Sequence, residues 1–364
     1  MKILIMGFGK IKFMPYLNFY LENIDKEKHE VHLLYWNRDL KHEDTSHLDG
    51  ITLHEFRCLQ EDDVPKGEKL GSFAEYRRFA LGVLKDEGFD FVIIMHSLTG
   101  IVVEDYIVRH FRDRFVFDFR DVTFENILPF KVAVGSLVRN SALTFVSSDI
   151  FRIYLPQEKN KILTIHNTSV READFTGSQK QKGKIRIGFW GFIRDKKLNE
   201  RVISCLGDDS RFELHFYGRE QDVALGLKAF VQESGFQNIF FHGEYAPEEK
   251  KSIIENTDLI HNIYDDKGAM LAVGNKYYDG VYYGKPQLCM EGSFMSVLCM
   301  GRGTGFSCNP YKEGFADKIY ELYNQLDYEQ LKRNCAGVAA EVSAQQERNA
   351  AVLTEVLAKK EVVG

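Results

Sequence analysis

The feature that most constrains this chain is an alternation of short apolar runs with helical stretches, which occurs twice. Apolar runs of strand length occupy residues 2–6, 31–36, 89–95, 115–119, 143–146 and 162–165, and then 185–190, 212–217, 239–241, 259–263 and 287–290. Continuous apolar runs are typical of parallel strands buried on both faces, and the helices between them supply the crossovers that parallel strands need. The pattern predicts an α/β protein with two Rossmann-like, doubly wound parallel-sheet domains.

A change in composition predicts where the two domains meet. Residues 167–184 are rich in Thr, Ser, Gln, Gly and Lys and have little apolar periodicity. We therefore expect a first domain over residues 1–170, a linker over 171–184 and a second domain over 185–345. Residues 346–364 are expected to form a helix that packs back towards the first domain. Ligands of open parallel sheets bind beyond the carboxyl ends of the strands, so both domains should direct loops into a cleft between them.

The net charge, the cysteine pattern and the length of the apolar runs exclude several classes of protein. A formal net charge of −6 disfavours a nucleic-acid partner, which would require a basic face. The six cysteines form no C-x-x-C pair, so neither a zinc site nor a redox motif is indicated, and a reducing, cytoplasmic setting is expected. No apolar run approaches the length of a transmembrane helix.

Residues 274–286 predict a short helix with a sharp end. Gly274 precedes the helix, Gly284 occupies the position typical of a helix-ending glycine, and Pro286 cannot continue it. Lys276 and Asp279 are three residues apart and share one face. A cation and a carboxylate after a glycine loop suit a phosphorylated ligand. The alternative is a capped surface helix with a solvated ion pair.

The first strand-to-helix loop of the second half is basic. It reads Gly-Phe-Ile-Arg-Asp-Lys-Lys over residues 191–197, with Arg194, Lys196 and Lys197 at the start of the next helix. Cations at a helix N-terminus suit a diphosphate, and a solvated basic turn is the alternative. No D-x-D triplet occurs in the chain, so we expect arginine and lysine, without a metal ion, to carry the charge of such a ligand.

Polar residues also end two predicted strands of the first half. The sequence Asp-Phe-Arg-Asp at 118–121 places Arg120 between two carboxylates, and His96 follows the strand 89–95 directly. These are suitable positions for a general base or for hydrogen bonds to sugar hydroxyls. The alternatives are a structural Asp–Arg pair and a structural histidine.

The first glycine turn resembles a dinucleotide fingerprint incompletely. Residues 7–12 read Gly-Phe-Gly-Lys-Ile-Lys, with Lys12 where the fingerprint requires a small residue. The second strand ends in Trp-Asn-Arg at 36–38, without the expected acid. NAD binding is therefore disfavoured, and a glycine turn containing Gly9 at the mouth of a cleft is the preferred interpretation.

Three segments together resemble GT-B glycosyltransferases. They are the strand 185–190 with its basic loop, the strand that ends in Phe-Tyr-Gly at 216–218, and Asn-Lys-Tyr-Tyr-Asp-Gly-Val-Tyr-Tyr-Gly-Lys-Pro at 275–286. The third is similar to the pattern Pro-x-Lys-hydrophobic-x-Glu/Asp followed by x-x-x-Gly-x-Pro. It is typical of the family 4-like group that builds bacterial surface polysaccharides. The architecture matches over essentially the whole chain, and the specific motifs lie in the second half.

The resemblance implies roles for individual residues. On the donor side, Asp279 would hold the nucleotide ribose, Arg194 and Lys197 the diphosphate, with Lys276 beside them. Gly191 and Gly218 would allow close backbone approach, and Tyr245 would lie beside the base. On the acceptor side, Asp121 and His96 would be catalytic, with Gly9 and Arg120 nearby. A second acid, common in retaining members eight residues before Asp279, is replaced by Leu271, so retaining and inverting mechanisms both stay open.

The expected activity is sugar transfer from a UDP- or GDP-linked donor, without a cofactor, to a saccharide acceptor. By resemblance, the acceptor would be lipid-linked and serve capsule, O-antigen or exopolysaccharide synthesis. The alternatives are a nucleotide-sugar epimerase of the same fold and a non-catalytic GT-B protein that binds a sugar or a partner. A peripheral contact with the inner face of the membrane is expected through residues 124–138, where Phe130, Lys131, Val134 and Leu137, followed by Arg139, have helical spacing. An ordinary core-facing helix is the other interpretation of that segment.

Overall fold

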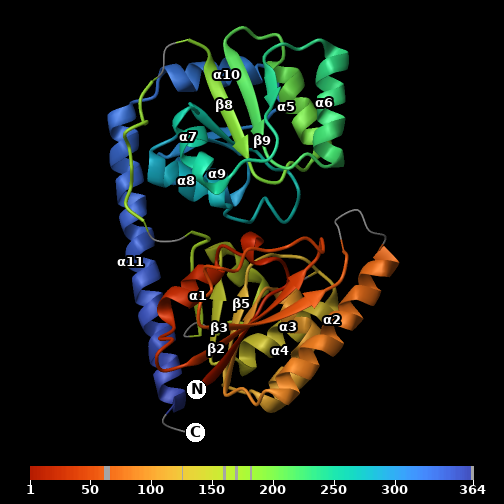
Figure 1. The fold of residues 1–364 in the computed structure, drawn as a ribbon. Helices are drawn as coiled ribbons and strands as arrows, with labels where there is room; N and C mark the ends of the chain where they lie inside the picture. The colour runs from red at the N-terminus through yellow and green to blue at the C-terminus, as the bar shows by residue number, and fades with distance from the viewer. Residues whose placement is uncertain (61–65, 125, 159–160, 169–170, 181–182, 362–364) are drawn as a thin grey trace. The chain divides into compact units, whose positions relative to one another are not determined.

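A computed structural model describes residues 1–60, 66–124, 126–158, 161–168, 171–180 and 183–361, with the backbone alone for 66–69 and 361 (Figure 1). The chain divides into two compact units. The first comprises Met1–Ser169 with Ala344–Gly364, and the second comprises Val170–Ser343. The described residues of the expected linker, 171–180 and 183–184, thus belong to the second unit. The last helix, α11 (Tyr328–Glu361), contributes its beginning to the second unit and its end to the first.

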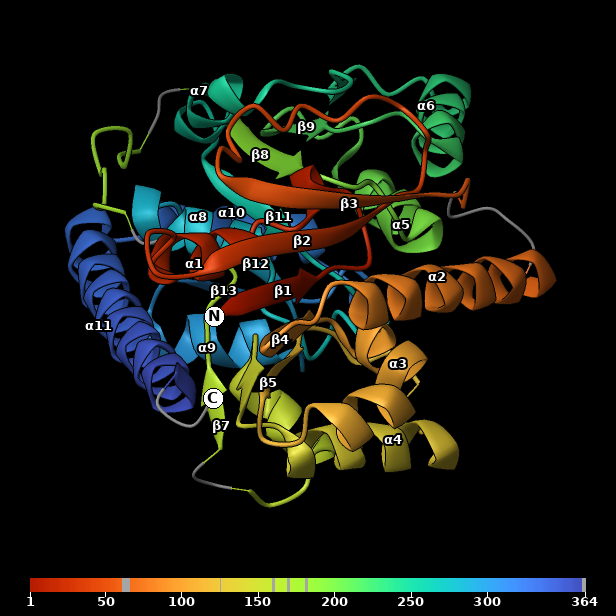
Figure 2. The same cartoon turned by 60° about the horizontal axis from the view of Figure 1, so that its bottom comes forward.

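The first unit is built on a seven-stranded sheet. Its elements, in which η marks a 3-10 helix, are β1 (Lys2–Met6), η1 (Ile11–Phe13), α1 (Leu17–Asn23), β2 (Glu30–Asn37), β3 (Ile51–Arg57), α2 (Lys66–Asp86), β4 (Phe91–Met95), α3 (Ser97–His110), β5 (Phe115–Phe119), α4 (Leu128–Asn140), β6 (Leu143–Val146), η2 (Asp149–Tyr154) and β7 (Ile162–Thr164). Helices α2, α3 and α4 lie on one face of this sheet (Figure 2). Helix α1 and the end of α11 pack on the other face and complete the core there.

The second unit is built on a six-stranded sheet. Its elements are β8 (Ile185–Trp190), α5 (Lys196–Leu206), β9 (Phe212–Tyr217), α6 (Asp222–Ser234), β10 (Ile239–Phe241), η3 (Pro247–Glu249), α7 (Lys250–Glu255), β11 (Leu259–Asn262), α8 (Asn275–Tyr283), β12 (Gln287–Met290), α9 (Phe294–Arg302), β13 (Gly305–Cys308), α10 (Phe315–Asn324) and the start of α11. Helices α5, α6 and α10 share one core with the strands. Helices α8, α9 and the start of α11 form a second core.

The two sheets repeat one topology. Their strand orders are β3-β2-β1-β4-β5-β6-β7 and β10-β9-β8-β11-β12-β13, and every described pairing is parallel. Apart from the added β7, both follow the doubly wound order 3-2-1-4-5-6, in which the winding reverses between the first and fourth strands. The predicted fold class of two Rossmann-like parallel-sheet domains is confirmed.

Two strands, β3 and β13, are absent from the prediction because neither is a continuous apolar run. Strand β3 reads Ile-Thr-Leu-His-Glu-Phe-Arg and is an edge strand, so polar residues alternate along its partly exposed length. Strand β13 has four residues, follows a glycine-rich turn and lies at the edge of the other sheet. Edge strands need less apolar surface than central ones, and periodicity detects them poorly.

Helix α8 is fixed at both ends. It begins after Gly274 and ends at Gly284, which adopts the left-handed conformation with φ of 59°. Immediately beyond it, the buried Lys285 Nζ donates to the carbonyls of Gly177, Glu255 and Thr257 at 2.8, 2.9 and 2.7 Å. Burial lowers the pKa of Lys285 to about 8. This cation satisfies three backbone acceptors and so anchors the C-terminal end of α8 to the body of the unit.

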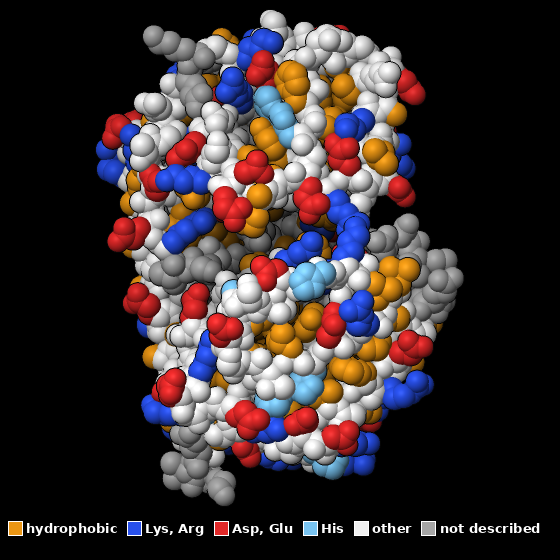
Figure 3. Space-filling view, in the orientation of Figure 1, with side chains coloured by type: hydrophobic (Ala, Val, Ile, Leu, Met, Phe, Trp, Pro, Cys, Tyr) orange, Lys and Arg blue, Asp and Glu red, His pale blue; other side chains and the backbone are white. Residues whose placement is uncertain are grey.

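The surface is mixed in charge. On the face shown in Figure 3, acidic and basic side chains are interspersed over each unit. Ion pairs between side chains, such as Lys312 with Glu291 and Arg77 with Asp105, occur in both units. No helix within the described part of the chain is long and apolar enough to span a membrane.

Candidate functional site

Asp279 lies in a buried cluster at the end of β8. Its Oδ1 accepts a hydrogen bond from Arg171 Nη2 at 2.9 Å. Its Oδ2 accepts one from Trp190 Nε1 at 2.9 Å and lies 2.9 Å from Lys250 Nζ. The carboxylate is therefore held by one buried indole and two partly exposed cations, and α8 is not the solvated surface helix that was the alternative prediction.

Lys276 lies one turn earlier on α8 and contacts the same strand end. Its Nζ donates to the Trp190 carbonyl at 3.2 Å and to Tyr264 Oη at 2.5 Å, and it lies 4.1 Å above the centre of the Phe189 ring. Burial, reinforced by the nearby Arg194 charge, lowers the pKa of Lys276 to about 7. An anion bound here would reverse that shift, because it would favour the protonated amine.

Arg194 and Lys276 converge on one aromatic ring. The Arg194 guanidinium lies 5.0 Å and Lys276 Nζ 5.1 Å from the centre of the Tyr264 ring. Arg194 and Lys197 were predicted to bind a diphosphate. Of these two, Arg194 lies near another cation, Lys276. Lys197 is exposed on the first turn of α5. The cation pair at this site is Arg194 with Lys276, which sequence spacing alone did not indicate.

The two glycines predicted to allow close approach lie against each other. Gly191 directly follows β8 and has φ of 114°, a conformation that residues with a side chain rarely adopt. A Cβ on Gly218 would lie 2.0 Å from the Gly191 carbonyl oxygen. Gly218 is therefore required by backbone packing at the ends of β8 and β9, and Gly191 by its backbone conformation.

Several residues of this cluster were missing from the prediction, namely Arg171, Lys250, Trp190 and Tyr264. Arg171 lies in the segment expected to be a linker, and nothing in its neighbourhood signals a site. Lys250 begins α7, five residues after Tyr245. Tyr245 packs against an apolar cluster that includes Trp190, and burial, with a contribution from the Asp279 charge, raises the pKa of Tyr245 to about 12. The sequence does offer one signal that could have identified Lys250, namely a basic residue shortly after the loop that contains Tyr245.

In the first unit, His96 and Asp121 come together at the ends of β4 and β5. His96 caps α3 with φ of 80°, and its Nδ1 accepts a hydrogen bond from the Leu98 amide at 3.2 Å. Its Nε2 lies 3.4 Å from Asp121 Oδ2. Because Nδ1 is an acceptor, a neutral imidazole carries its proton on Nε2 and directs it towards Asp121. The Asp121 side chain is 60% exposed and accessible to a ligand.

Arg120 pairs with the other carboxylate. Its Nε lies 2.7 Å from Asp118 Oδ1, and its guanidinium lies 4.5 Å from the centre of the Tyr16 ring. Asp118 Oδ2 accepts a hydrogen bond from Tyr20 Oη at 2.7 Å. The Arg120–Asp118 pair is buried, so Arg120 is not exposed as a binding group.

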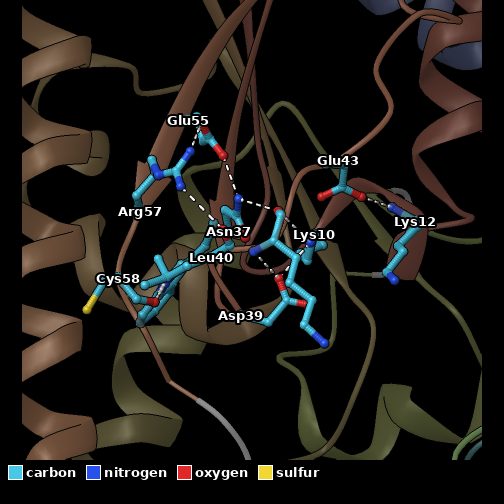
Figure 4. Close-up of polar contacts among 11 residues, drawn as sticks. Lys10, Lys12, Asn37, Asp39, Leu40, Glu43, Glu55, Arg57 and Cys58 are labelled. Carbon is cyan, nitrogen blue, oxygen red and sulfur yellow. Dashed lines mark hydrogen bonds and ion pairs between the residues drawn. The ribbon is translucent and has the colours of Figure 1, made fainter. Parts of the chain in front are cut away.

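The turn that contains Gly9 is held against the end of β2 by hydrogen bonds and an ion pair. Figure 4 shows the side chains that take part. The Gly9 carbonyl accepts from the Trp36 amide at 3.2 Å. The buried Lys10 Nζ lies 2.6 Å from Asp39 Oδ1 and donates to the Lys41 carbonyl at 3.0 Å. Asn37 Nδ2 donates to Glu55 Oε1 at 2.6 Å, where a dinucleotide-binding fold would place its ribose-binding acid. Hydrogen bonds and an ion pair among the protein's own residues therefore occupy this end of β2.

Metal ligands do not cluster in the part of the chain that the structure describes. No group of three or more His, Cys, Asp or Glu there could hold a metal ion. The six cysteines are all free thiols.

Comparison with known proteins shows the fold. No protein-family model matches the sequence, and no curated protein matches it. Among solved structures, sucrose-phosphate synthase from Thermosynechococcus elongatus is similar at 11% identity with a TM-score of 0.74, covering 98% of this chain and 99% of that one. HepE from Anabaena in complex with UDP is similar at 15% identity with a TM-score of 0.67, covering 98% and 100%. The lipopolysaccharide outer core galactosyltransferase WaaB matches at 11% identity with a TM-score of 0.62, covering 97% and 99%. The chain therefore has the GT-B architecture along its length.

The contact between Gly218 and Gly191 supports a stability prediction. The substitution Gly218→Ala forces a methyl group into a backbone carbonyl, which cannot move aside as a side chain can. We expect a loss of about 3 kcal/mol or more in the stability of the second unit. The measurement is urea unfolding followed by Trp190 fluorescence in a Trp36→Phe background, which removes the second tryptophan of the chain. The matched control is Gly337→Ala in α11, where a Cβ meets nothing within 4 Å and should stabilise by up to about 1 kcal/mol. Equal effects of the two substitutions would contradict this account.

Proposed function

We propose that this protein is a glycosyltransferase that moves a sugar from a nucleotide diphosphate-sugar to a saccharide acceptor. The observation that carries the proposal is the cluster at the end of β8, where a buried carboxylate on α8 adjoins the paired cations Arg194 and Lys276. The HepE structures solved with UDP and with UDP-glucose have the same fold, which supports a nucleotide-sugar as the ligand.

The donor-binding chemistry follows from the charges. The Asp279 carboxylate is a suitable acceptor for ribose hydroxyls, and Arg194 and Lys276 suit the diphosphate. As the sugar leaves, negative charge develops on the diphosphate, and cations already in place stabilise it without reorganisation. In this proposal arginine and lysine supply the charge that a metal ion supplies in other enzymes. In the same proposal, Tyr245 flanks the base.

The acceptor chemistry rests on Asp121 and His96. Asp121 has an exposed carboxylate that can accept the proton of an acceptor hydroxyl. His96 serves as its positioning residue, because Nε2–H is directed at Asp121 while Nδ1 is occupied by the Leu98 amide. This division of roles suits an inverting transfer, in which the base removes the proton as the hydroxyl attacks the sugar.

A lipid-linked acceptor and a peripheral membrane contact complete the proposal. The structure corrects the residues expected to make that contact, because Val134 and Leu137 are buried in the core of the first unit. An apolar ridge, defined as Phe124, Ile127, Leu128 and Val132, is exposed instead at the start of α4. Its side chains are 51–70% exposed, and Lys131 lies among them. Exposed apolar side chains with a lysine are suited to the inner, anionic face of a cell membrane.

Nucleotide binding and transfer should be separable by substitution. UDP or GDP at about 100 times its Kd should add about 2.7 kcal/mol to the stability of the folded protein, seen as a rise in melting temperature. Asp279→Asn should abolish that rise, because a neutral amide is a poorer acceptor for two hydroxyls. Asp121→Asn should keep the rise and lower the transfer rate by about 100-fold or more. The exposed Asp86→Asn is the control for both measurements. If neither nucleotide raises the melting temperature of the unaltered protein, the proposal is wrong, and conversion of the nucleotide-sugar without an acceptor would favour the epimerase.

Donor affinity should fall as the pH rises above 7. The folded-state pKa of Lys276 is lowered to about 7, so an increasing fraction of the amine is neutral above that pH and must take up a proton when the diphosphate binds. The Kd for UDP should therefore rise between pH 7 and 9, by at most about tenfold for each pH unit. Lys276→Arg stays charged over this range and should flatten the dependence. Lys197→Arg is the matched control, and comparison of the variants cancels the titration of UDP itself. An identical pH dependence in Lys276→Arg would exclude Lys276 from the diphosphate site.

The apolar ridge predicts binding to vesicles. The protein should cosediment with vesicles that contain anionic phospholipid, and the double substitution Leu128→Ser with Val132→Ser should reduce the bound fraction at least about fivefold, since each side chain loses apolar contact with the lipid. Val297→Ser, at a similarly exposed valine of α9, is the control and should bind as the unaltered protein does. Absence of binding by the unaltered protein, or equal binding by all three proteins, would rule out the ridge as a membrane contact.

A further inference from the structure

The partners of Asp279 already fill most of its hydrogen-bonding capacity. An ionised carboxylate offers about four acceptor sites, two on each oxygen. In the structure, Trp190 and Lys250 approach Oδ2, and Arg171 approaches Oδ1. Two ribose hydroxyls require two acceptor sites, so one of the three present partners has to yield when both hydroxyls bind.

Arg171 is the partner best able to yield. Trp190 is buried at the end of a central strand and cannot withdraw. Arg171 contributes one hydrogen bond, through Nη2, and its side chain is 36% exposed. Its Nε is buried without a hydrogen-bond partner, so the guanidinium does not make the two-pronged contact that would hold it tightly. Its guanidinium also lies 4.8 and 5.2 Å from the ring centres of Tyr282 and Tyr283, so it keeps favourable contacts if it leaves the carboxylate.

The backbone around Arg171 is held independently of its side chain. The Asp174 amide donates to the Tyr282 carbonyl at 2.8 Å, and Ser178 Oγ donates to the Gly284 carbonyl at 2.5 Å. Lys251 pairs with Asp174 at 2.8 Å. These contacts dock residues 171–180 on the end of α8. Movement of the Arg171 side chain therefore needs no movement of the segment, and variants at this position are expected to fold.

We propose that Arg171 is an internal competitor of the nucleotide ribose for the Asp279 carboxylate. The inference rests on the proposed function, because it takes Asp279 as the ribose site. A ribonucleotide binds by exchanging the Arg171 contact for a second hydroxyl contact, and Arg171 returns to Asp279 as the nucleotide leaves. A 2′-deoxynucleotide donates one hydroxyl, uses the remaining acceptor site on Oδ1 and leaves Arg171 in place. Arg171 thereby limits how tightly ribonucleotides are held, which speeds release of the nucleoside diphosphate product.

The test is the ratio of Kd for 2′-deoxy-UDP to Kd for UDP, measured by calorimetry in the unaltered protein and in Arg171→Ala. Removing the competitor should tighten UDP binding and leave 2′-deoxy-UDP comparatively unaffected, so the ratio should rise about fivefold, the scale of a partly exposed ion pair. The loss of one positive charge weakens both ligands alike, because they carry the same diphosphate, and it cancels in the ratio. Stopped-flow dissociation of UDP should slow by a similar factor.

Lys251→Ala is the matched control. It removes a cation one residue from Lys250 and one of the contacts of the docked segment, yet it leaves the partners of Asp279 unchanged, so the ratio should stay constant. GDP and 2′-deoxy-GDP replace the uridine pair if the protein binds guanosine nucleotides. A ratio that is unchanged or lower in Arg171→Ala would overturn the competitor role while leaving nucleotide binding intact. If the unaltered protein binds neither UDP nor GDP, the proposed function and this inference fail together.

Discussion

The candidate donor site depends on the contact between the end of β8 and the buried face of α8. Trp190 forms both halves of that contact, because its indole donates to Asp279 and its carbonyl accepts from Lys276. One residue thus holds an acid and a base that lie one helical turn apart, which prevents them from pairing with each other alone. Burying two charges is costly unless each has partners, and here the strand end supplies them. The other strands and helices of the second unit hold β8 and α8 in the relative positions that this contact requires.

The fold places such a contact at the edge of the sheet where ligands of open parallel sheets bind. In a doubly wound sheet the helices after the first and fourth strands leave in opposite directions, and the carboxyl ends between them stay uncovered. In the second unit these strands are β8 and β11, and in the first unit they are β1 and β4. His96 follows β4, and Trp190 ends β8. Repetition of one topology therefore provides each unit with a polar site at the carboxyl ends of its strands, after β4 and β5 in the first unit and after β8 in the second.

Much of this architecture was predictable from the sequence because central parallel strands are continuous apolar runs. The edge strands β3 and β13 were missed for the same reason, since polar residues interrupt β3 and β13 reads Gly-Phe-Ser-Cys, so neither is a continuous apolar run. The end of α8 was also predictable, because Gly284 adopts a left-handed conformation and Pro286 follows it. The position of Asp279 on that helix followed from local spacing, and the structure shows it buried beside the strand end. Its role in binding ribose stays a prediction.

The sequence by itself determined the repeated α/β pattern and the chemistry-bearing strand ends, because period, turn residues and capping act over a few neighbouring positions. Only the tertiary structure decided the partners of each charge. Arg171 and Lys250 are separated from Asp279 by 108 residues and by 29, and no local rule connects them. Likewise, Arg194 meets Lys276 across 82 residues, and the exposure of the ridge at Leu128 depends on which face of α4 the core covers. Pairings of this kind are set by packing of distant segments, and a single sequence records the segments without recording which of them touch.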